Sequence, residues 1–516
     1  MSSSTEKAIG KIIISSSLGT LIEWYDFYIF GMLAKTISMQ FFPDGNSTAA
    51  LLSTLAIFAA GFLVRPFGAL VFGRLGDLIG RKYTFLLTLV LMGSATFLIG
   101  LVPGYKSIGM AAPLLVLLLR LVQGLALGGE YGGAATYVAE HAPNNKRGFY
   151  TSWIQTTATL GLFVALAIIL LVKSNMSDAA FNSEWGGWRY PFWISILLVG
   201  VSIYIRLKMK ESPLFEILKK EGTTSANPIK ESFGHKENFK MVLLALFGAV
   251  MGQGVIWYTS QFYTQSFLEH SVKLDFIQNR EIVLWAIALA TPFFLFFGWL
   301  SDKTGRKWIM LTGMLLGVIF YRPIFNTFLN DTNGKEWMQR AEGRSYVKLA
   351  GQKNPYIKRD SLKTSTGILV ITHTTNTWLL KEGIQFTEKI ADTSGIDNDG
   401  GSWVALDNNP VYSGKILSAP LKWKFIFLVW IMIVFVTMVY GPIAAFLVEL
   451  FPTKIRYTSM SLPYHIGNGV FGGLVPFIAT LLATTVTTDP LAGLWYPIAV
   501  AALCFVIGFV FLDDKK

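Results

Sequence analysis

Residues 73–82 read GRLGDLIGRK, and residues 298–307 read GWLSDKTGRK. The two stretches share Gly, Leu, Asp, Gly, Arg and Lys in register, at an offset of 225 residues. A second pair, EHAPNNKR at 140–147 and ELFPTKIR at 449–456, shares Glu, Pro and Arg at an offset of 309 residues. Two repeated pairs in the same order indicate a chain built from two duplicated halves.

Long apolar runs surround these repeats. The chain is 52% hydrophobic and 15% charged, whereas soluble domains carry about 25% charged residues. Runs of about 20 apolar residues can cross the membrane as helices, and they do not alternate as membrane β-strands do. The composition therefore excludes a soluble globule, a disordered chain and a fibrous protein. We predict twelve spans, at about 12–34, 50–74, 83–102, 112–139, 149–172, 189–208, 240–264, 281–300, 308–329, 423–448, 457–483 and 492–512.

The basic residues alternate between the two sides of these spans. The net charge of +12 would also suit a nucleic-acid-binding protein. However, Lys and Arg cluster after spans two, four, six, eight and ten and at the C-terminus, as the inside-positive bias of membrane proteins requires. We therefore expect a multi-pass protein of the cell inner (plasma) membrane with both termini in the cytoplasm. The first apolar run contains Glu23 and Asp26 and lacks a cleavage site, so it is interpreted as the first span and not as a signal peptide.

The two repeat offsets differ by 84 residues, which indicates an insertion of about that length in the second half. Residues 331–421 are polar, with strand-like runs at 367–373 and 377–387, and by topology they lie outside the cell. We expect a small accessory insert that is mostly β or irregular. The predicted organisation is an N-terminal six-helix bundle (1–208), a cytoplasmic linker (209–239), a C-terminal bundle in two parts (240–330 and 422–516) and the insert (331–421).

The duplicated loops are predicted gating elements. Each combines a tight glycine turn, an acid at the end of one helix and basic residues at the start of the next. A single copy would read equally well as a charged turn, but two copies at equivalent places favour a latch. The residues assigned to gating are Gly73, Asp77, Arg81, Asp302, Arg306, Glu140, Arg147, Glu449 and Arg456.

Ionisable residues inside the spans are the predicted site of proton coupling. Each charge at mid-membrane costs roughly 2.5–3.5 kcal/mol on insertion scales, so such residues persist when they pair or line a wet cavity. Glu23 and Asp26 share one face of span one, where mutual repulsion and burial favour a protonated form. The alternative is that one or both lie near the membrane interface, or that they form fixed ion pairs with Arg65 or Arg120. We assign proton coupling to Glu23, Asp26, Arg120 and Glu130, although Arg120 equally suits a structural ion pair.

A second set of polar and aromatic residues is predicted to bind the substrate. Arg65 precedes a proline in span two, and an Arg can hold a carboxylate in a bidentate fork. Arg322 also precedes a proline, but it lies near the outer end of span nine, where snorkelling to the interface explains it. His465 is a possible proton relay, but a hydrogen-bonded core histidine is the favoured interpretation. The residues assigned to substrate binding are Arg65, Tyr28, Gln155, Gln253, Trp257, Gln261 and Asn468.

Other activities have weak signals. Cys504 is the single cysteine, so no disulfide or cysteine-based metal site can form within the chain. The sequence lacks a phosphate-cradling G-x-x-x-x-G-K-[ST] loop and any spacing typical of a zinc site. We therefore expect no cofactor, no metal and no enzymatic activity. The glycines of 124–133 are interpreted as helix-packing residues and not as a nucleotide site.

The motifs as a set resemble the major facilitator superfamily. The duplicated loop, Arg120-x-x-Gln123-Gly124 and twelve spans carry that resemblance. The runs GTLIEWYDFY (19–28), RPFG (65–68) and GGEYGGA (128–134) are similar to the metabolite:proton symporter family, which includes transporters of α-ketoglutarate, shikimate, citrate, and proline or betaine. The resemblance implies alternating access about a central site, proton-driven import, and roles for the span-one acids and the span-four arginine. It leaves the insert unexplained.

The sequence therefore predicts a secondary transporter with two six-helix bundles that rock about a midplane site. Arg65 and Arg120 favour an organic anion, such as a dicarboxylate or a shikimate-like acid. The alternatives are a proline- or betaine-type osmolyte transporter and, more remotely, a receptor or scaffold that uses the 331–421 insert. We expect protons, a small metabolite and membrane lipid as partners, no nucleic acid, and a functional monomer.

Overall fold

The computed structural model describes most of the chain. It covers the backbone of residues 3–43, 45–79, 81–129, 135, 138–139, 142–208, 234–341, 355–364, 367–380, 382–397, 402–405, 409–451 and 456–513. Side chains are described over the same ranges apart from 3–16, 73–79, 81–85, 144, 205–206, 208, 340–341, 360–364, 367–369, 395–397, 402–404 and 456–458.

Helices dominate the N-terminal half, which the runs of apolar residues predict. They are α1 (Ser3–Met32), α2 (Ala34–Phe41), α3 (Ser47–Leu63), α4 (Arg65–Ile79), α5 (Arg81–Ile99), α6 (Tyr105–Ile108), α7 (Ala111–Gly128), η1 (Asn144–Lys146), α9 (Arg147–Ser174), α10 (Asp178–Phe181), η2 (Gly187–Arg189) and α11 (Tyr190–Lys208). The spans pack closely where glycine removes the side chain. A Cβ at Gly124 would lie 1.9 Å from Gly61 O, and one at Gly128 would lie 2.2 Å from Arg65 O. These two glycines therefore serve helix packing, as predicted.

The C-terminal half repeats this pattern with more interruptions. Its elements are α14 (Lys236–Ala245), η3 (Leu246–Val250), α15 (Met251–Tyr258), η4 (Thr259–Tyr263), α16 (Thr264–His270), α17 (Phe276–Thr304), α18 (Arg306–Asp331), α19 (Gly334–Ala341), α20 (Ala419–Leu450), α21 (Arg456–His465), η5 (Ile466–Gly472), α22 (Val475–Leu481), η6 (Leu482–Val486), η7 (Ala492–Leu494) and α23 (Trp495–Phe511). Four of these, η3 to η6, are π-helical.

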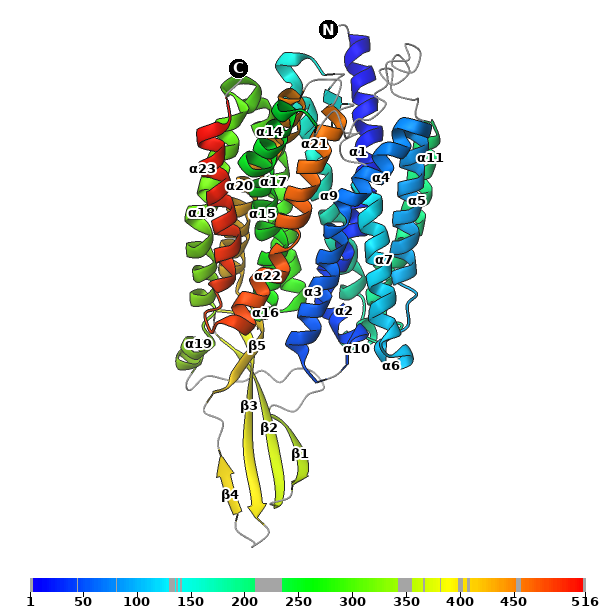
Figure 1. Cartoon of the computed structure of the whole chain (residues 1–516). Coiled ribbons are helices and arrows are strands. Elements are labelled where there is room, and N and C mark those ends of the chain that lie inside the picture. The colour runs from blue at the N-terminus through cyan, green and yellow to red at the C-terminus, as the bar shows by residue number, and fades with distance from the viewer. Residues whose placement is uncertain are drawn as a thin grey trace. The chain divides into compact units, whose positions relative to one another are not determined.

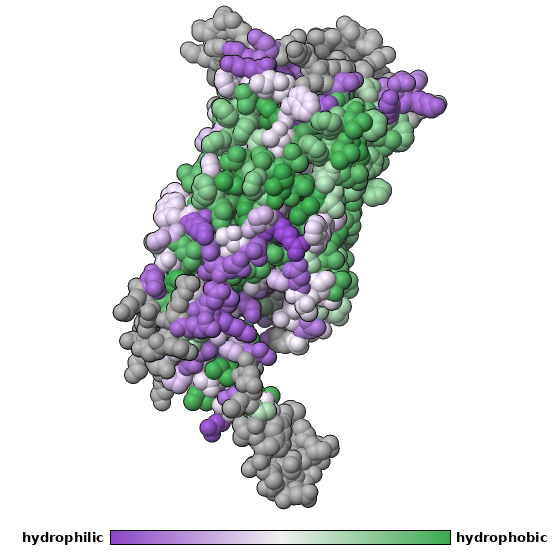
Figure 2. All heavy atoms as spheres, turned by 90° about the vertical axis from the view of Figure 1, so that its left-hand side faces the viewer, coloured by the Kyte–Doolittle hydropathy of each residue, from purple (hydrophilic) through white to green (hydrophobic). Residues whose placement is uncertain are grey.

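Eleven of the twelve predicted spans fall on a helix or a run of consecutive helices, and the fourth (112–139) falls on α7 as far as Gly128, beyond which most of its residues lie outside the described set. Nine runs are long and apolar enough to cross a membrane within the described residues. The other three predicted spans fall on α1, α5 and α11, some of whose side chains lie outside the described set. The N-terminal end of α1 and the C-terminal end of α23 lie on the same side of the bundle (Figure 1), as an even number of spans requires. On the face in Figure 2, apolar side chains form a broad band over the upper part of the helices, which suits contact with lipid, and hydrophilic side chains lie below it.

The chain divides into two compact units. One comprises Met1–Thr264, Leu284–Pro323 and Val429–Lys516, and the other comprises Gln265–Val283 and Ile324–Leu428. The first unit contains most of the twelve spans. The second contains parts of α16, α17, α18 and α20 together with the insert.

The insert contains a five-stranded antiparallel sheet, which confirms the predicted small β insert. Its strands are β1 (Tyr356–Thr364), β2 (Gly367–Leu379), β3 (Gln385–Asp397), β4 (Ser402–Ala405) and β5 (Val411–Ile416). The order is β1-β2-β3-β4, and β5 also pairs with β3. The β2–β3 hairpin forms because β2 is rich in Ile, Val and Thr, which favour strands, and because Gly383 adopts the left-handed conformation (φ 83°) in the connection.

Side chains of the second unit hold the sheet to neighbouring helices. Gln278 on α17 accepts a hydrogen bond from Leu417 N (2.6 Å) and donates one to Leu417 O (3.0 Å). Lys415 Nζ donates to Thr332 O (2.7 Å), just after α18. The insert is therefore anchored at the point where β5 leads into α20.

A carboxylate outside the spans makes the stability of the N-terminal half depend on pH. Glu184 Oε1 accepts hydrogen bonds from Ser107 Oγ and from Gly104 N (2.9 Å). The Ser107 hydroxyl, followed by the Gly104 amide, lowers the pKa of Glu184 from its usual 4.5. A lowered pKa in the folded state adds stability above pH 4.5, and this stability is lost as the pH falls through the lowered value.

We therefore expect the melting temperature of the Glu184→Gln variant to depend less on pH in the acid range than that of wild type. Thermal unfolding in detergent should show wild type losing its advantage over the variant as the pH falls below 4.5. Because Glu184 is partly exposed to solvent, the advantage at neutral pH should be small. Parallel pH profiles for both proteins would contradict the role of this carboxylate.

Candidate functional site

The first feature of the site is a buried arginine held among aromatic rings. Arg65 begins α4, after a break at Val64 that ends α3, and its side chain is 0% exposed. Its guanidinium carbon lies over the rings of Phe62 (4.1 Å), Phe27 (4.4 Å) and Trp24 (5.2 Å). Within the described residues, its Nε and Nη2 donate no hydrogen bond. A buried cation without an anionic partner is costly, so this arrangement favours binding of an anion.

Arg120 is the second buried cation, and neutral oxygens hold it. Its Nη1 donates to Gln123 Oε1 (2.7 Å) and to Phe27 O (3.2 Å), and Gln123 Nε2 donates in turn to Thr96 Oγ1 (2.6 Å). Its guanidinium carbon lies 4.0 Å from the centre of the Phe27 ring. Arg120 forms no ion pair with any residue that the structure describes. The alternative prediction, a structural ion pair, therefore has no acidic partner among those residues.

The acids of span one are buried in the same region of α1. Asp26 is 1% exposed and Glu23 is 2% exposed. Neither carboxyl oxygen of Asp26 accepts a hydrogen bond from any residue that the structure describes. Asp26 is therefore not locked in an ion pair with Arg65 or Arg120 in this conformation, and its side chain can change protonation without breaking a contact.

Residues of the C-terminal half complete the cluster. The ring of Tyr28 stacks on Trp24 (5.0 Å between ring centres) and on Trp257 of α15 (5.3 Å), so the two halves meet at this pair of rings. Asn468 Nδ2 donates to Gln253 Oε1 (2.7 Å). Gln261 is 0% exposed, and within the described part of the chain neither of its amide atoms is hydrogen-bonded.

Three further predicted residues can be placed. Gln155 lies buried on α9. His465 is 1% exposed, lies within electrostatic range of Arg65, and makes no side-chain hydrogen bond to the described residues, so the favoured hydrogen-bonded core histidine is not what the structure has. Arg322 is 39% exposed and pairs with Asp489 (3.2 Å), as expected for a side chain near an interface.

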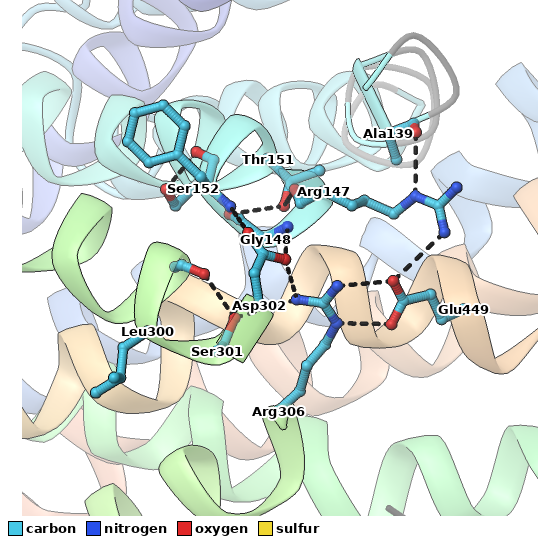
Figure 3. Close-up of polar contacts among 12 residues, drawn as sticks. Ala139, Arg147, Gly148, Thr151, Ser152, Leu300, Ser301, Asp302, Arg306 and Glu449 are labelled. Carbon is cyan, nitrogen blue, oxygen red and sulfur yellow. Dashed lines mark hydrogen bonds and ion pairs between the residues drawn. The ribbon is translucent and has the colours of Figure 1, made fainter. Parts of the chain in front are cut away.

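The predicted gating residues that are described form one charged cluster (Figure 3). Arg306 Nε and Nη2 donate to the two oxygens of Glu449 (2.6 and 2.7 Å), and its Nη1 contacts Asp302 (3.1 Å). Arg147, from the other half, lies 3.4 Å from Glu449. The cluster therefore joins the two halves of the chain, as a latch requires.

Asp302 also caps a helix of the opposite half. Its Oδ1 accepts from Gly148 N (2.7 Å) and its Oδ2 accepts from Phe149 N (2.9 Å), at the start of α9. Free amides and the positive end of the helix dipole at this position favour a carboxylate. A Cβ at Gly148 would lie 2.5 Å from Gly298 O, so glycine allows the two helices to come this close.

Some predicted residues fall outside the described set, and some contacts were not predicted. Glu130 and Glu140 are not described, and neither are the side chains of Gly73, Asp77, Arg81 and Arg456. The aromatic rings of Trp24, Phe27 and Phe62 around Arg65 could not be predicted from the sequence. The motif WYDFY contains two of these rings, but nothing in it indicates which cation they cover.

The fold and the buried polar site define a multi-pass membrane transporter with two related halves. A family described as "Sugar (and other) transporter" matches residues 12–244. The inner membrane metabolite transport protein YhjE of Escherichia coli (strain K12) is 31% identical over 479 residues, which are 92% of this chain and 88% of that protein. The alpha-ketoglutarate permease of the same organism is 37% identical over 329 residues, which are 64% of this chain and 74% of that protein.

Solved structures agree on the fold. The xylose transporter XylE from E. coli, in a partially occluded inward open conformation, matches with a TM-score of 0.62 and 15% identity over 98% of each chain. The chain belongs to the major facilitator superfamily, and it is a transporter of metabolites. The predicted family and fold are thereby confirmed, and the relatives are transporters and not enzymes.

Proposed function

We propose that this protein carries a small organic anion into the cell together with protons, by alternating access. The observation that carries the proposal is Arg65, whose buried guanidinium has aromatic faces around it and two nitrogens with no hydrogen-bond acceptor in the described residues. A carboxylate is the ligand that this fork fits best. Arg120 adds a second positive charge nearby and so strengthens attraction to an anion.

Asp26 supplies the proton site in this proposal. A carboxyl group buried without a hydrogen-bond donor is far more easily accommodated when it is neutral. Asp26 takes a proton on the outer side, and the anion binds at Arg65. Both leave on the inner side after the halves have rocked. Glu23, three residues earlier on the same helix face, is the second acid of this pathway.

The charged cluster is the inner gate in this account. Loops rich in Lys and Arg face the cytoplasm in membrane proteins, and the cluster lies in such loops. The termini then lie in the cytoplasm, and the protein works as a monomer in the inner membrane. The cluster must open for inward release, so the ion pairs of Glu449 and the helix cap by Asp302 oppose that step.

Asp302→Asn is therefore expected to favour opening at this end. A neutral amide removes the charge-assisted bonds to α9 and Arg306, each worth roughly 1.5–3 kcal/mol. Spin labels attached at Asn145→Cys and Thr304→Cys, in a Cys504→Ser background, would report the distance between the two halves by double electron–electron resonance spectroscopy. We expect the population with the longer distance to rise about tenfold.

Glu281→Gln is the matched control for that experiment. Glu281 pairs with Lys422 (3.3 Å), and both belong to the C-terminal half. Its loss should leave the distance distribution unchanged. Equal distributions in Asp302→Asn and wild type would contradict the gating role.

One observation favours a second candidate, a zwitterionic osmolyte such as betaine or proline. The stacked rings of Trp24, Tyr28 and Trp257 present aromatic faces that attract a quaternary ammonium. Such a substrate also carries a carboxylate for Arg65. Curated relatives include a proline/betaine transporter of Escherichia coli (strain K12), 33% identical over 325 residues.

Radiolabelled uptake separates the two candidates. Cells that express the protein would be tested with α-ketoglutarate, shikimate, proline and glycine betaine at two pH values. The proposal predicts uptake of a carboxylate without an ammonium group, and faster uptake at the lower external pH. Uptake of betaine or proline alone would overturn the anion assignment, and equal rates at both pH values would overturn proton coupling.

A further inference from the structure

The two halves differ in the regularity of their central helices. Spans seven and eleven of the C-terminal half contain four π-helical segments, η3 and η4 in the first and η5 and η6 in the second. Their counterparts by duplication, α1 and α9, are continuous α-helices of 30 and 28 residues. In a π-turn the N–H reaches the carbonyl five residues back, as Gly473 N does to Asn468 O (2.9 Å). Such turns are rare and are often found at functional sites.

The π-segments carry or adjoin the C-terminal residues of the candidate site. Gln261 lies inside η4, and Trp257 lies two residues before it. Asn468 lies inside η5, and His465 directly precedes it. One extra residue in a turn rotates the following side chains by about 100°. The direction in which Gln261 and Asn468 point therefore depends on whether each segment stays π-helical.

A tyrosine from α18 donates a hydrogen bond to the backbone of α15, three residues before η4 begins. Tyr321 is 0% exposed, and its hydroxyl donates to Ile256 O (3.0 Å). The same hydroxyl lies 2.8 Å from the hydroxyl of Ser260, which is inside η4 and also lies 3.1 Å from Met432 O. A side chain of a neighbouring helix thus binds carbonyl and hydroxyl groups at the irregular turn.

A second tyrosine does the same at η5. Tyr496, near the start of α23, donates from its hydroxyl to Phe471 O (2.8 Å), a carbonyl inside η5. The two irregular helices also pack on each other without side chains between them, because a Cβ at Gly254 would lie 2.5 Å from Gly467 O. The hydrogen bond between Gln253 and Asn468 joins them at this level.

We propose that Tyr321 and Tyr496 are positioning residues for transport, whose hydroxyls hold η4 and η5 in the π-form that aims Gln261 and Asn468 at the transport path. The inference rests on the proposed function only in taking these two amides as part of that path. Loss of either hydroxyl leaves a buried carbonyl with one donor fewer and makes the ordinary α-helical turn the better alternative. Neither tyrosine touches the substrate.

Tyr321→Phe and Tyr496→Phe test the proposal with two measurements. Amide hydrogen exchange, followed by mass spectrometry, should speed up in peptides that cover 256–264 in the first variant and 466–473 in the second. The KM for uptake, with α-ketoglutarate and glycine betaine as probes, should rise about tenfold for the probe that wild type transports. A merely structural role would lower the amount of folded protein and the maximal rate, and would leave KM unchanged.

Tyr25→Phe is the matched control. Tyr25 is also 0% exposed and also donates to a backbone carbonyl, Pro191 O (2.7 Å), but it joins two regular helices, α1 and α11. Its KM should stay at the wild-type value. The proposal is overturned if KM is unchanged in both test variants, if KM rises without faster exchange in the matching peptide, or if Tyr25→Phe raises KM equally.

The two readouts also separate this inference from the proposed function. Hydrogen exchange needs no substrate. It therefore tests whether the tyrosine hydroxyls stabilise η4 and η5, whichever probe is transported. Uptake of betaine alone would remove the anion assignment and leave the positioning test intact. Two independent variants keep the test decisive if one of them fails to fold.

Discussion

Asp26→Asn is expected to abolish the accumulation of substrate driven by a pH gradient, while exchange of labelled for unlabelled substrate across the membrane continues. The amide has nearly the shape of the carboxyl group, but it cannot take up and release a proton. Because Asp26 is 1% exposed and accepts no hydrogen bond within the described residues, the substitution breaks no contact that the structure shows. Uptake into proteoliposomes, with and without an inward pH gradient, measures both activities.

Two companion variants make this result specific. Glu23→Gln tests the neighbouring acid, and it should reduce accumulation if the two carboxyls share the proton. Asp178→Asn is the control, because the Asp178 side chain is 89% exposed on the short helix α10. Unchanged accumulation in both Asp26→Asn and Glu23→Gln would remove these acids from the coupling mechanism.

Arg65→Lys should raise the KM for the anion by about ten- to a hundredfold. Lysine keeps the positive charge but loses the planar fork, so at least one charge-assisted hydrogen bond worth roughly 1.5–3 kcal/mol is lost. The lysine side chain is also shorter, and its ammonium group cannot stack as a plane on the rings of Phe27 and Phe62. Initial rates of uptake over a range of substrate concentrations give KM and the maximal rate separately.

The chain provides a closely matched control for this substitution. Arg322 also precedes a proline in a span, but it is 39% exposed and pairs with Asp489. Arg322→Lys should change KM less than about twofold, since exposed ion pairs contribute little. Equal KM values in wild type and Arg65→Lys would show that this guanidinium does not hold the substrate.

The sequence predicts much of the fold because duplication and hydropathy are local signals. The repeats at 73–82 and 298–307 indicate the two halves, and the unequal offsets locate the insert between α18 and α20. The runs of Ile, Val and Thr near 367–387 mark two of its strands. The sequence did not indicate α19, a short polar helix of eight residues that precedes the sheet.

The site is less accessible to sequence analysis because its contacts join distant helices. The repeated motifs mark Asp302 and Glu449 as important charges, but they do not reveal that Asp302 caps α9 of the other half. The pattern places Arg65 in a span, but not against Phe27 and Phe62. The π-segments have no clear sequence signal, since the tyrosines that hydrogen-bond at or beside them lie on other spans.

The central claim is that proton and anion movement are coupled through buried ionisable side chains. Its most direct test is accumulation of radiolabelled α-ketoglutarate or shikimate in proteoliposomes that contain only this protein, under an imposed inward pH gradient. The account predicts accumulation above equilibrium, up to about tenfold per pH unit for one proton per substrate, and its collapse on addition of a protonophore. Entry that stops at equal concentrations inside and outside, whatever the gradient, would contradict it.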